Sequence, residues 1–582
     1  MAEQIISPGV FTRENDQSFI QEGIARIGAA VIGPTAKGPA MAPTVVTTIS
    51  QFENIFGTTV LSGSKYYTYL TNLTARSYFE NGGNSMLVIR VLSGSYTPAT
   101  SQVNIWSQSL SLSGSTECFT LETLSVGSIM NNAGNEVSGA LVSGSADNIR
   151  WQIGNVNTGS GTFTLYIRRG NDNNRTPVYL ETWTNLSLDP NSDNYLPSVI
   201  GDQTQTMMTD SNGSVYMQVT GSYPNNSRYV RVKSINQLTP DYLDINGNVR
   251  IASYTASLPA IVSGTFANGS DGIVLNPQNF YDAINNTNSQ GYGVEPNAQG
   301  PYNQAISLLS NSDQYDYNLL FLPGLAAQNS NHLPIINSAI DMISNRGDAM
   351  LVMDLMNYGT ANLASVTAQA ASFNTSFAAT YWPWVQYKNP YLGNYVWCPA
   401  SVALAGAIAN NDRIGAEWFA PAGLNRGGLP TVIRPERKIP LADRNVLYDS
   451  NVNPLASFPG AGTVVYGQKT LQKSASALDR VNVRRLLIAL KKFIASSSRY
   501  LVFEQNTNAT RNRFLSIVNP YLESVQQRQG LYAFKVVMDS SNNTPDVIDR
   551  NQLVGQIFLQ PARTAEFIIL DFTLEPTGAT FS

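Results

Sequence analysis

Apolar residues follow two different spacings along the chain, and these spacings divide it into segments of different predicted structure. Residues 24–92 and 246–411 combine short apolar runs with stretches of helical periodicity. The apolar runs are typical of strands buried on both faces. They lie at 25–39, 86–91, 318–324 and 349–355. The helical stretches lie at 71–83, 333–347, 360–372 and 401–411. We therefore predict one discontinuous α/β domain with a parallel sheet, built from two separated stretches of chain.

Residues 93–245 have a different pattern, in which apolar and polar residues alternate. Segments such as GTFTLYIRRG and SVYMQVTGS lie between turns rich in Gly, Asn, Ser and Asp. A period of two is typical of antiparallel strands with one face in the core and one in water. We predict an antiparallel β-rich insertion over 93–245 that interrupts the α/β domain.

The third region, residues 412–582, has a mixed α+β pattern, and both ends of the chain resemble strands. Residues 1–23 read as an extended arm, and the apolar residues of 565–576 occupy both faces of a strand. Such ends pair within the subunit or add a strand to the sheet of a neighbouring subunit, and the sequence leaves both alternatives open. The candidate inter-subunit strand residues are Ile5, Ile6, Val10, Phe11, Phe567, Ile568, Ile569, Leu570 and Phe572.

Residues 479–500 form the clearest amphipathic helix of the sequence. One predicted face is apolar and contains Val483, Leu486, Leu487, Leu490 and Ile494. The opposite face is basic and contains Arg480, Arg484, Arg485, Lys491, Lys492 and Arg499. This basic stripe is either an ordinary solvated face or a docking surface for an acidic partner protein.

Composition narrows the possible functions. Charged residues make up 13% of the 582 residues, hydrophobic residues 43%, and the net charge is −4. A folded, slightly acidic chain is expected, with no nucleic-acid partner. We find no apolar run of roughly 18 residues and no secretory signal, so we expect no membrane insertion.

The sequence offers few groups for catalysis. It contains one histidine, His332, and two distant cysteines, Cys118 and Cys398, which we expect to be buried free thiols. It has no Walker A sequence and no zinc-ligand spacing. We therefore predict no catalytic, metal or cofactor site and a protein that is not an enzyme. His332 is expected to be a structural residue at the start of a helix.

Carboxylates of the insertion leave one possibility open. Asp241, Asp244 and Glu181 lie in polar, turn-rich sequence that could line a sugar cleft. The spacing of Asp244, Asn246 and Asn248 resembles a calcium loop without its distal glutamate, and a hairpin turn is the competing interpretation.

Several ordered stretches resemble the tail sheath proteins of contractile-tailed bacteriophages. They include SPGVFTREND followed by residues 27–57, SYFENGGNSMLVIRVL at 77–92, and LADRNVLYDSNVNPLASFPGAGTVVYGQKTLQ at 441–472. ALDRVNVRRLLIALKKFI at 477–494 and the stretch at 503–539 continue the resemblance. These segments cover most of the chain outside 93–245, which matches nothing in the family and is expected to be an outward domain.

The resemblance implies a fold and an assembly. The α/β domain would be a subtilisin-like middle domain without catalytic residues. Residues 412–582 and the N-terminal arm would form an α+β inner domain, whose helix at 480–499 faces the tail tube. Subunits would stack as hexameric rings around that tube and contract to drive it through the host envelope. The implied partners are further copies of the chain, the tube protein, and baseplate and tail terminator proteins. The implied location is the virion, after synthesis in the host bacterial cytoplasm.

Two alternatives remain. The chain could be the sheath of a phage-derived injection device, such as a tailocin or a secretion system. It could instead be a virion glycan-binding protein acting through the insertion, where Trp106, Trp151 and Trp183 would stack on sugars or fill a β core.

Overall fold

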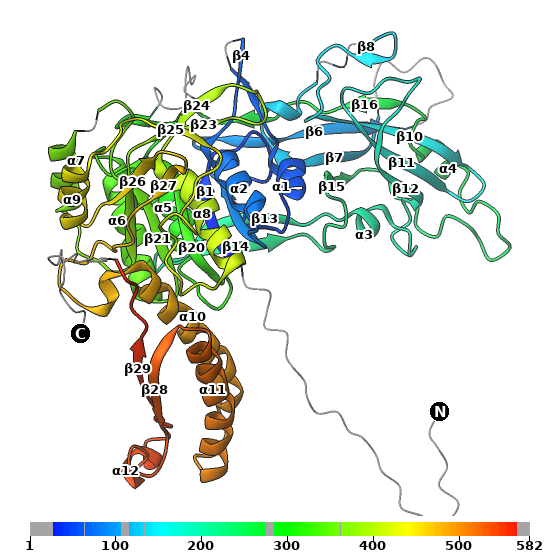
Figure 1. The fold of residues 1–582 in the computed structure, drawn as a ribbon. Coiled ribbons are helices and arrows are strands. Elements are labelled where there is room, and N and C mark those ends of the chain that lie inside the picture. Colours follow the sequence, from blue (N-terminus) through cyan, green and yellow to red (C-terminus); the bar gives the residue numbers. More distant parts are fainter. Residues whose placement is uncertain are drawn as a thin grey trace, which may run out of the picture.

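The computed structural model describes residues 27–566 except 63, 106–115, 133, 135, 275–283 and 361. It consists of an α/β body, a β-rich insertion beside it, and a unit that projects from one side of the body (Figure 1). The predicted strand residues of the two chain ends lie outside the described residues. They are Ile5, Ile6, Val10, Phe11, Phe567, Ile568, Ile569, Leu570 and Phe572.

An eight-stranded sheet forms the centre of the body. Its strands, in order, are β2 (Thr44–Val46), β5 (Met86–Arg90), β1 (Ile27–Gly33), β20 (Tyr317–Ala326), β21 (Met350–Asp354), β22 (Ala378–Trp382), β26 (Asn453–Phe458) and β27 (Gly462–Val465). Each neighbouring pair from β5 to β26 is parallel, and the two edge strands are antiparallel. The prediction of one sheet from two separated stretches of chain is confirmed.

Helices cover both faces of this sheet and explain why its strands are apolar throughout. One face packs against α1 (Ile49–Phe56), α2 (Leu70–Glu80) and α8 (Ala400–Ile414). The other packs against α5 (Pro301–Leu308), α6 (His332–Arg346) and α7 (Leu363–Ala370). Successive residues of β1 alternate between the two cores: Ala30 and Ile32 face one, Ala29 and Val31 the other. Burial on both faces is the usual state of a parallel sheet.

The sheet continues past the boundary predicted at residue 411. Strands β26 and β27 belong to it, because β26 runs parallel to β22. They are short and lie among Gly- and Pro-containing loops, so the sequence pattern did not link them to the distant strands of the same sheet. Helix α9 (Leu441–Asp449) and a small sheet of β23 (Val385–Lys388), β24 (Tyr395–Cys398) and β25 (Val432–Pro435) complete this side.

The insertion consists mainly of two four-stranded antiparallel sheets around one core. The first contains β12 (Tyr179–Ser187), β11 (Thr162–Arg169), β10 (Ile149–Asn157) and β16 (Ser263–Thr265). The second contains β15 (Val230–Ile235), β7 (Glu117–Val126), β6 (Tyr96–Asn104) and β17 (Ser270–Asp271). The insertion therefore extends beyond the predicted end at residue 245, because β16 and β17 pair within its sheets.

The two chain connections of the insertion lie side by side, and we call this place the neck. Strand β6 pairs with β17, with Thr97 opposite Ser270 and Tyr96 opposite Asp271. The fully buried Arg90 lies beside them and donates hydrogen bonds to the carbonyls of Gly38 (2.8 Å) and Val126 (2.6 Å). Its guanidinium also lies 3.4 Å from Asp271 Oδ1. The neck thus joins the body and both ends of the insertion.

A hairpin of the insertion also reaches the body. It consists of β13 (Thr204–Thr209) and β14 (Val215–Thr220). Met207, Val215 and Met217 share one face of this hairpin and pack against the core beside α5. The insertion is therefore held at a second point besides the neck.

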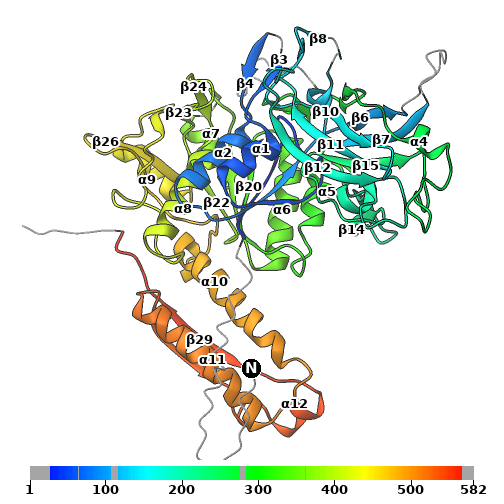
Figure 2. The ribbon, with the colours of Figure 1, turned by 90° about the vertical axis from the view of Figure 1, so that its right-hand side faces the viewer.

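The projecting unit contains α10 (Val481–Ser498), α11 (Asn508–Gln527), β28 (Leu531–Val537), α12 (Pro545–Asp549) and β29 (Gln556–Pro561). In Figure 2, α10 and α11 lie beside the β28–β29 pair, below the body. The remaining short elements are β3 (Val60–Ser62), β4 (Lys65–Tyr67), β8 (Glu136–Val137), β9 (Ala140–Leu141), α3 (Leu196–Ile200), α4 (Tyr254–Ser257), β18 (Asn288–Ser289) and β19 (Tyr292–Gly293).

Candidate functional site

Helix α10 joins the body to the projecting unit and is buried along two sides. Val481 and Ile488 lie in the core beneath the body's sheet. Four residues of the predicted apolar face, Leu486, Leu487, Leu490 and Ile494, instead pack in a second core with α11, in which Leu486 and Leu490 are buried. The predicted apolar face is therefore confirmed, but it is only one of two buried sides of the helix.

The second buried side changes the interpretation of the basic stripe. Arg484 and Arg485 are each only 4% exposed, so these two residues are not part of an ordinary solvated face. Arg485 donates from both terminal nitrogens to Asp412 of α8, at 2.9 and 2.5 Å. Burial opposes the charge of Arg485, but Asp412 outweighs it and raises the pKa of the guanidinium.

The C-terminal half of α10 is also tied to the body. Lys492 Nζ donates to the carbonyl of Tyr317 (2.7 Å) and to Asn318 Oδ1 (2.8 Å), and it pairs with Asp316. Directly after the last residue of the helix, Arg499 pairs with Asp313 at 2.9 Å on the surface. These contacts hold the C-terminal half of α10 at the N-terminal end of β20.

The N-terminal end of α10 holds the chain that returns from β29. Arg480 Nε donates to Glu566 at 2.8 Å. Glu566 also accepts from the Tyr448 hydroxyl (2.7 Å) and from Gln468 (3.0 Å). Burial raises the pKa of this carboxyl, but these donors outweigh it and lower the pKa overall. The projecting unit is thus anchored to the body at both ends of α10.

Arg484 differs from its neighbours on the helix. Its guanidinium donates to Ser376 Oγ and lies 4.0 Å from the centre of the Phe377 ring. Its Nε has no hydrogen-bond partner among the residues that the structure describes. Burial lowers the pKa of Arg484 to about 10.

Of the six predicted stripe residues, Lys491 and Arg499 are the two that lie exposed. Contact with a tube stays a prediction for these two residues. The sequence could not reveal the other role of the stripe, because the carboxylates at Asp313, Asp316 and Asp412 lie far from the helix along the chain.

A cleft of about 410 Å³ separates part of the projecting unit from the body. Its charged lining is of mixed sign, with Asp412 and Arg413 from the body and Glu417 and Arg528 near α11. Trp418 closes one side, where its indole donates to the carbonyl of Arg528 at 3.0 Å. No sequence pattern predicted this cleft, since its lining comes from separate segments.

Two titratable groups are buried inside the body. His332 is the first residue of α6, as predicted, and its Nδ1 accepts from the backbone N–H of Ala326 at 3.1 Å. Burial lowers its pKa to about 4. Asp354 accepts from both the N–H (3.2 Å) and the hydroxyl (2.5 Å) of Ser401 at the start of α8.

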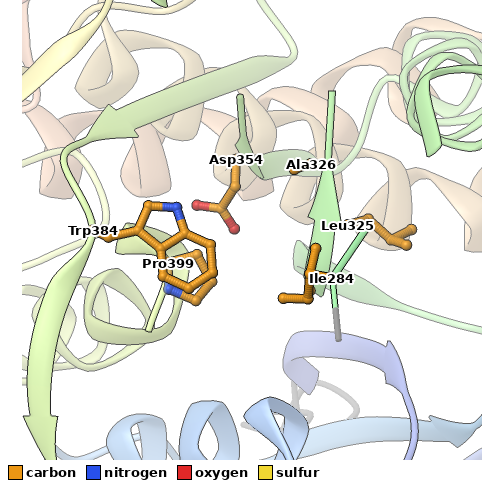
Figure 3. Close-up of a pocket in the computed structure, with 7 residues that line it drawn as sticks. Ile284, Leu325, Ala326, Asp354, Trp384 and Pro399 are labelled. Atoms are coloured by element: carbon orange, nitrogen blue, oxygen red, sulfur yellow. The ribbon is translucent and has the colours of Figure 1, made fainter. Parts of the chain in front are cut away.

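The surroundings of Asp354 do not form a substrate site. Trp384, Pro399 and Ile284 enclose it (Figure 3), and no space the size of a water molecule remains between them. Burial raises the pKa of Asp354 to about 7, while Ser401 partly offsets this. The group is a buried structural carboxyl whose charge is disfavoured.

The insertion carboxylates serve local structure. Asp244 accepts from the backbone N–H groups of Asn246 and Asn248, both at 2.9 Å, which is turn chemistry. Asp241 pairs with Arg250, and Glu181 accepts from Ser227. Within the described residues, no group of three His, Cys, Asp or Glu side chains could hold a metal ion. Cys118 and Cys398 are buried free thiols, as predicted.

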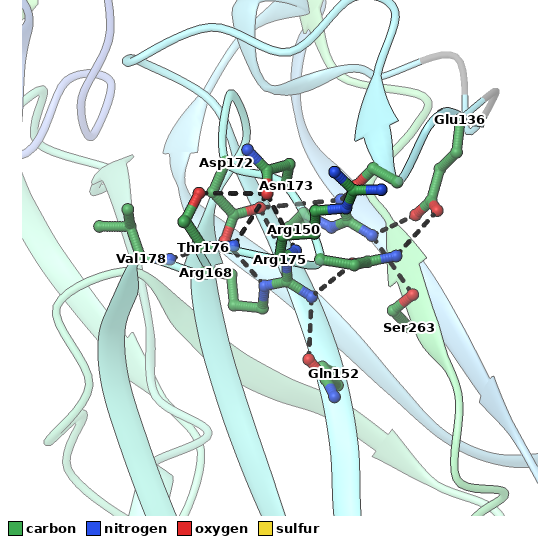
Figure 4. A network of polar contacts seen from close by, with 12 residues as sticks. Glu136, Arg150, Gln152, Arg168, Asp172, Asn173, Arg175, Thr176, Val178 and Ser263 are labelled. Atoms are coloured by element: carbon green, nitrogen blue, oxygen red, sulfur yellow. Dashed lines mark hydrogen bonds and ion pairs between the residues drawn. The ribbon is translucent and has the colours of Figure 1, made fainter.

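A polar network lies on the outer face of the insertion's first sheet (Figure 4). Arg168 donates twice to Asp172, at 2.8 and 3.0 Å, and Arg150 pairs with Glu136 and lies 3.7 Å from Asp172. Arg150 and Arg168 are at most 2% exposed. The prediction of a wet face is therefore wrong at this place, because loops on either side cover the strands.

The tryptophans of the insertion favour a structural role. Trp151 is 3% exposed and belongs to the core, and Trp183 packs against the same core. Trp106 lies outside the described residues. No helix among the described residues has the length and apolar character needed to cross a membrane.

Comparison with known proteins finds two matching family models. Residues 300–471 match the phage tail sheath protein central domain, and residues 473–575 match the phage tail sheath C-terminal domain. The first of these covers the body from α5 to the end of its sheet, and the second covers α10 and the projecting unit.

Individual proteins agree with these models. The chain is 42% identical over 186 residues to the tail sheath protein of Vibrio phage KVP40, covering 32% of this chain and 28% of the relative. It is 37% identical over 230 residues to that of Enterobacteria phage T4, covering 40% and 35%. The match thus spans about a third of the length of these curated relatives.

A solved structure shares the fold over nearly its whole length. The sheath tail protein of Listeria innocua superposes with a TM-score of 0.52, covering 92% of this chain and 96% of that one. Sequence identity is 10%, so this likeness concerns the fold.

Proposed function

Since the chain belongs to the contractile phage tail sheath family through residues 300–575, we propose that it is a structural subunit of such a sheath. Its subunits polymerise as stacked hexameric rings around a tail tube. The sheath then contracts and drives the tube through the host envelope. The match of two consecutive sheath domains, in order and across the joint at α10, is the observation that carries this proposal.

The β28–β29 pair supports a polymer linked by strands. These two strands pair only with each other in the part of the chain that the structure describes. Two-stranded sheets are marginally stable alone, and unpaired edges accept further strands. The strand-like segments at 1–23 and 565–576 are of a length to pair with such edges in neighbouring subunits.

The side chains of this pair fit the same role. Phe534 and Val536 lie opposite Leu559 and Ile557 and pack against α11. The other face carries Phe558, which is 55% exposed, and Tyr532 at the register shift of β28 is 63% exposed. An added strand would therefore extend a sheet that already rests on one helix.

The joint at α10 supports movement of each subunit as a unit. Two cores and the pairs of Arg480, Arg485 and Lys492 fix the projecting unit to the body. Contraction then proceeds by changing contacts between nearly rigid subunits, and greater burial in the contracted state supplies the free energy. No nucleotide and no catalytic step are part of this mechanism.

The proposed partners are further copies of the chain, the tube protein, and baseplate and tail terminator proteins. The curated relatives are phage tail sheath proteins, which favours a virion over an injection device. The subunit is made in the host cytoplasm. The core positions of Trp151 and Trp183 weigh against glycan binding as the main role.

Electron microscopy of the purified protein tests the proposal. Negative-stain images at increasing protein concentration should show long hollow tubes with a regular axial repeat. Protein that remains monomeric at every concentration, with and without its tube protein, would contradict the proposed function.

A further inference from the structure

Arg484 is a buried cation for which the described residues supply no counter-charge. It is 4% exposed, and no ion pair joins it to a carboxylate of residues 27–566 as the structure describes them. Its contacts are the Ser376 hydroxyl and the face of the Phe377 ring. Neither of these groups carries a charge.

The neighbouring cations of α10 show what is missing. Arg480, Arg485 and Lys492 each have a carboxylate partner at short range. The pKa of Arg485 is raised by Asp412, whereas that of Arg484 is lowered by its burial. Arg484 and Arg485 lie on the same helix, so the opposite shifts of their pKa values follow from the carboxylate partner that Arg485 has.

Leaving a guanidinium buried without a counter-charge costs free energy, because the charge loses its hydration and gains no partner. Folding alone does not select such an arrangement, because an uncharged side chain of similar size would fill the same space at lower cost. A cation at this position is explained when a carboxylate reaches it in another state of the protein.

The location of Arg484 allows such an approach. Ser376 and Phe377 belong to the loop between α7 and β22, where residues 371, 372 and 374 are exposed. The Phe377 ring is itself only half-buried. The guanidinium thus lies just beneath the surface, at the edge between this loop and α10.

We propose that Arg484 binds a carboxylate of a second copy of this chain, and that this ion pair forms when subunits assemble. The proposal rests on the proposed function, which brings copies into contact. The chain contains 40 acidic and 36 basic residues, so each copy offers acidic side chains in excess. Planar guanidinium forks match carboxylates in two parallel hydrogen bonds, which gives the contact a defined geometry.

The variant Arg484→Gln tests this ion pair, because it removes the charge and keeps much of the side chain. The thermal midpoint of the unpolymerised subunit should stay the same or rise, since a buried unpaired charge is lost. The critical concentration for polymerisation, measured by sedimentation, should rise at least roughly tenfold. Arg484→Lys keeps the charge but lacks the planar guanidinium. Its critical concentration should lie between those of the wild type and Arg484→Gln.

Arg485→Gln is a matched control on the same helix, and Arg513→Gln is a control on α11. Arg485→Gln breaks the pair with Asp412 and should lower the midpoint of the subunit. Arg513→Gln removes an exposed charge and should leave both the midpoint and the critical concentration unchanged.

Two results would overturn the inference while the proposed function stands. One is tube formation by Arg484→Gln at the wild-type critical concentration. The other is a fall in its subunit midpoint as large as that of Arg485→Gln, which would place the partner within the same subunit. Failure of the wild-type protein itself to polymerise would overturn the proposed function and this inference together.

Discussion

Asp354 and His332 lie inside the body and respond to pH in opposite directions. Asp354 has a pKa of about 7 in the folded chain against 3.8 for the free group, so the folded state binds its proton more tightly. His332 has a pKa of about 4 against 6.5, so the folded state binds its proton less tightly. Acidification therefore stabilises the fold through Asp354 and destabilises it through His332.

The variant Asp354→Asn should separate the effect of Asp354 on stability from that of His332. The wild-type carboxyl favours folding below pH 4 and loses that contribution as pH rises towards 7, by at most about 1.4 kcal/mol per pH unit. The variant lacks this loss, so its thermal midpoint at pH 8 should exceed that of the wild type. Between pH 6.5 and 5 its midpoint should fall on acidification, since His332 then acts without compensation.

Thermal unfolding of both proteins from pH 5 to pH 8 measures the effect. Parallel profiles for Asp354→Asn and the wild type would show that Asp354 does not hold its proton in the fold.

At the scale of elements, the sequence pattern identified individual strands and helices but not the segments that pack against them. The apolar runs identified β1, β5, β20 and β21, because burial on both faces leaves a continuous signal. The amphipathic pattern identified α10 and its apolar face, which the structure packs against α11. It could not show that the polar side of α10 also packs, since the covering groups come from loops far away in sequence.

The same limitation applies to the insertion. Alternation in GTFTLYIRRG identified β11, and the pattern predicted one solvated face for the strands of the insertion. Arg150 and Arg168 are instead buried under strand β8, which carries Glu136, and the loop that carries Asp172. Alternation records which face is polar, and it does not record whether another segment covers that face.

The buried network predicts a localised loss of stability. Asp172→Asn removes the carboxylate shared by two buried arginines and should cost about 3–5 kcal/mol in local stability of the insertion. Peptide-resolved hydrogen exchange over β10, β11 and β12 should show faster opening, with the body unchanged. Asp241→Asn breaks an exposed pair with Arg250 and should cost less than about 1 kcal/mol. Equal exchange in the two variants would rule out a central role for Asp172.

On the scale of the whole molecule, the order of the domains along the chain was predictable, but the residues at which each domain begins and ends were not. The β-rich segment interrupts the sheet as expected, but β16 and β17 extend it and β26 and β27 extend the body. Short strands carry too little pattern to assign, and only pairing with distant strands defines them. The predicted inter-subunit strands at both ends lie outside the described residues, and their role stays a prediction.

Removal of residues 1–23 tests that role in the assembly. If the arm pairs with a neighbouring subunit and not with its own, the truncated subunit should keep the wild-type thermal midpoint. It should fail to form tubes if the arm supplies a strand to a neighbour. Tubes of normal length from the truncated protein would show that the arm pairs elsewhere or not at all.

The neck has a consequence for how such a chain can be altered. Its two crossing points, at Tyr96 and Asp271, are paired neighbours, so the segment between them leaves and re-enters the body at one place. A foreign domain whose termini lie close together could be grafted there without disturbing the order of the central sheet. The hairpin of β13 and β14 would be lost with the graft, leaving the apolar surface beside α5 to be replaced by polar residues.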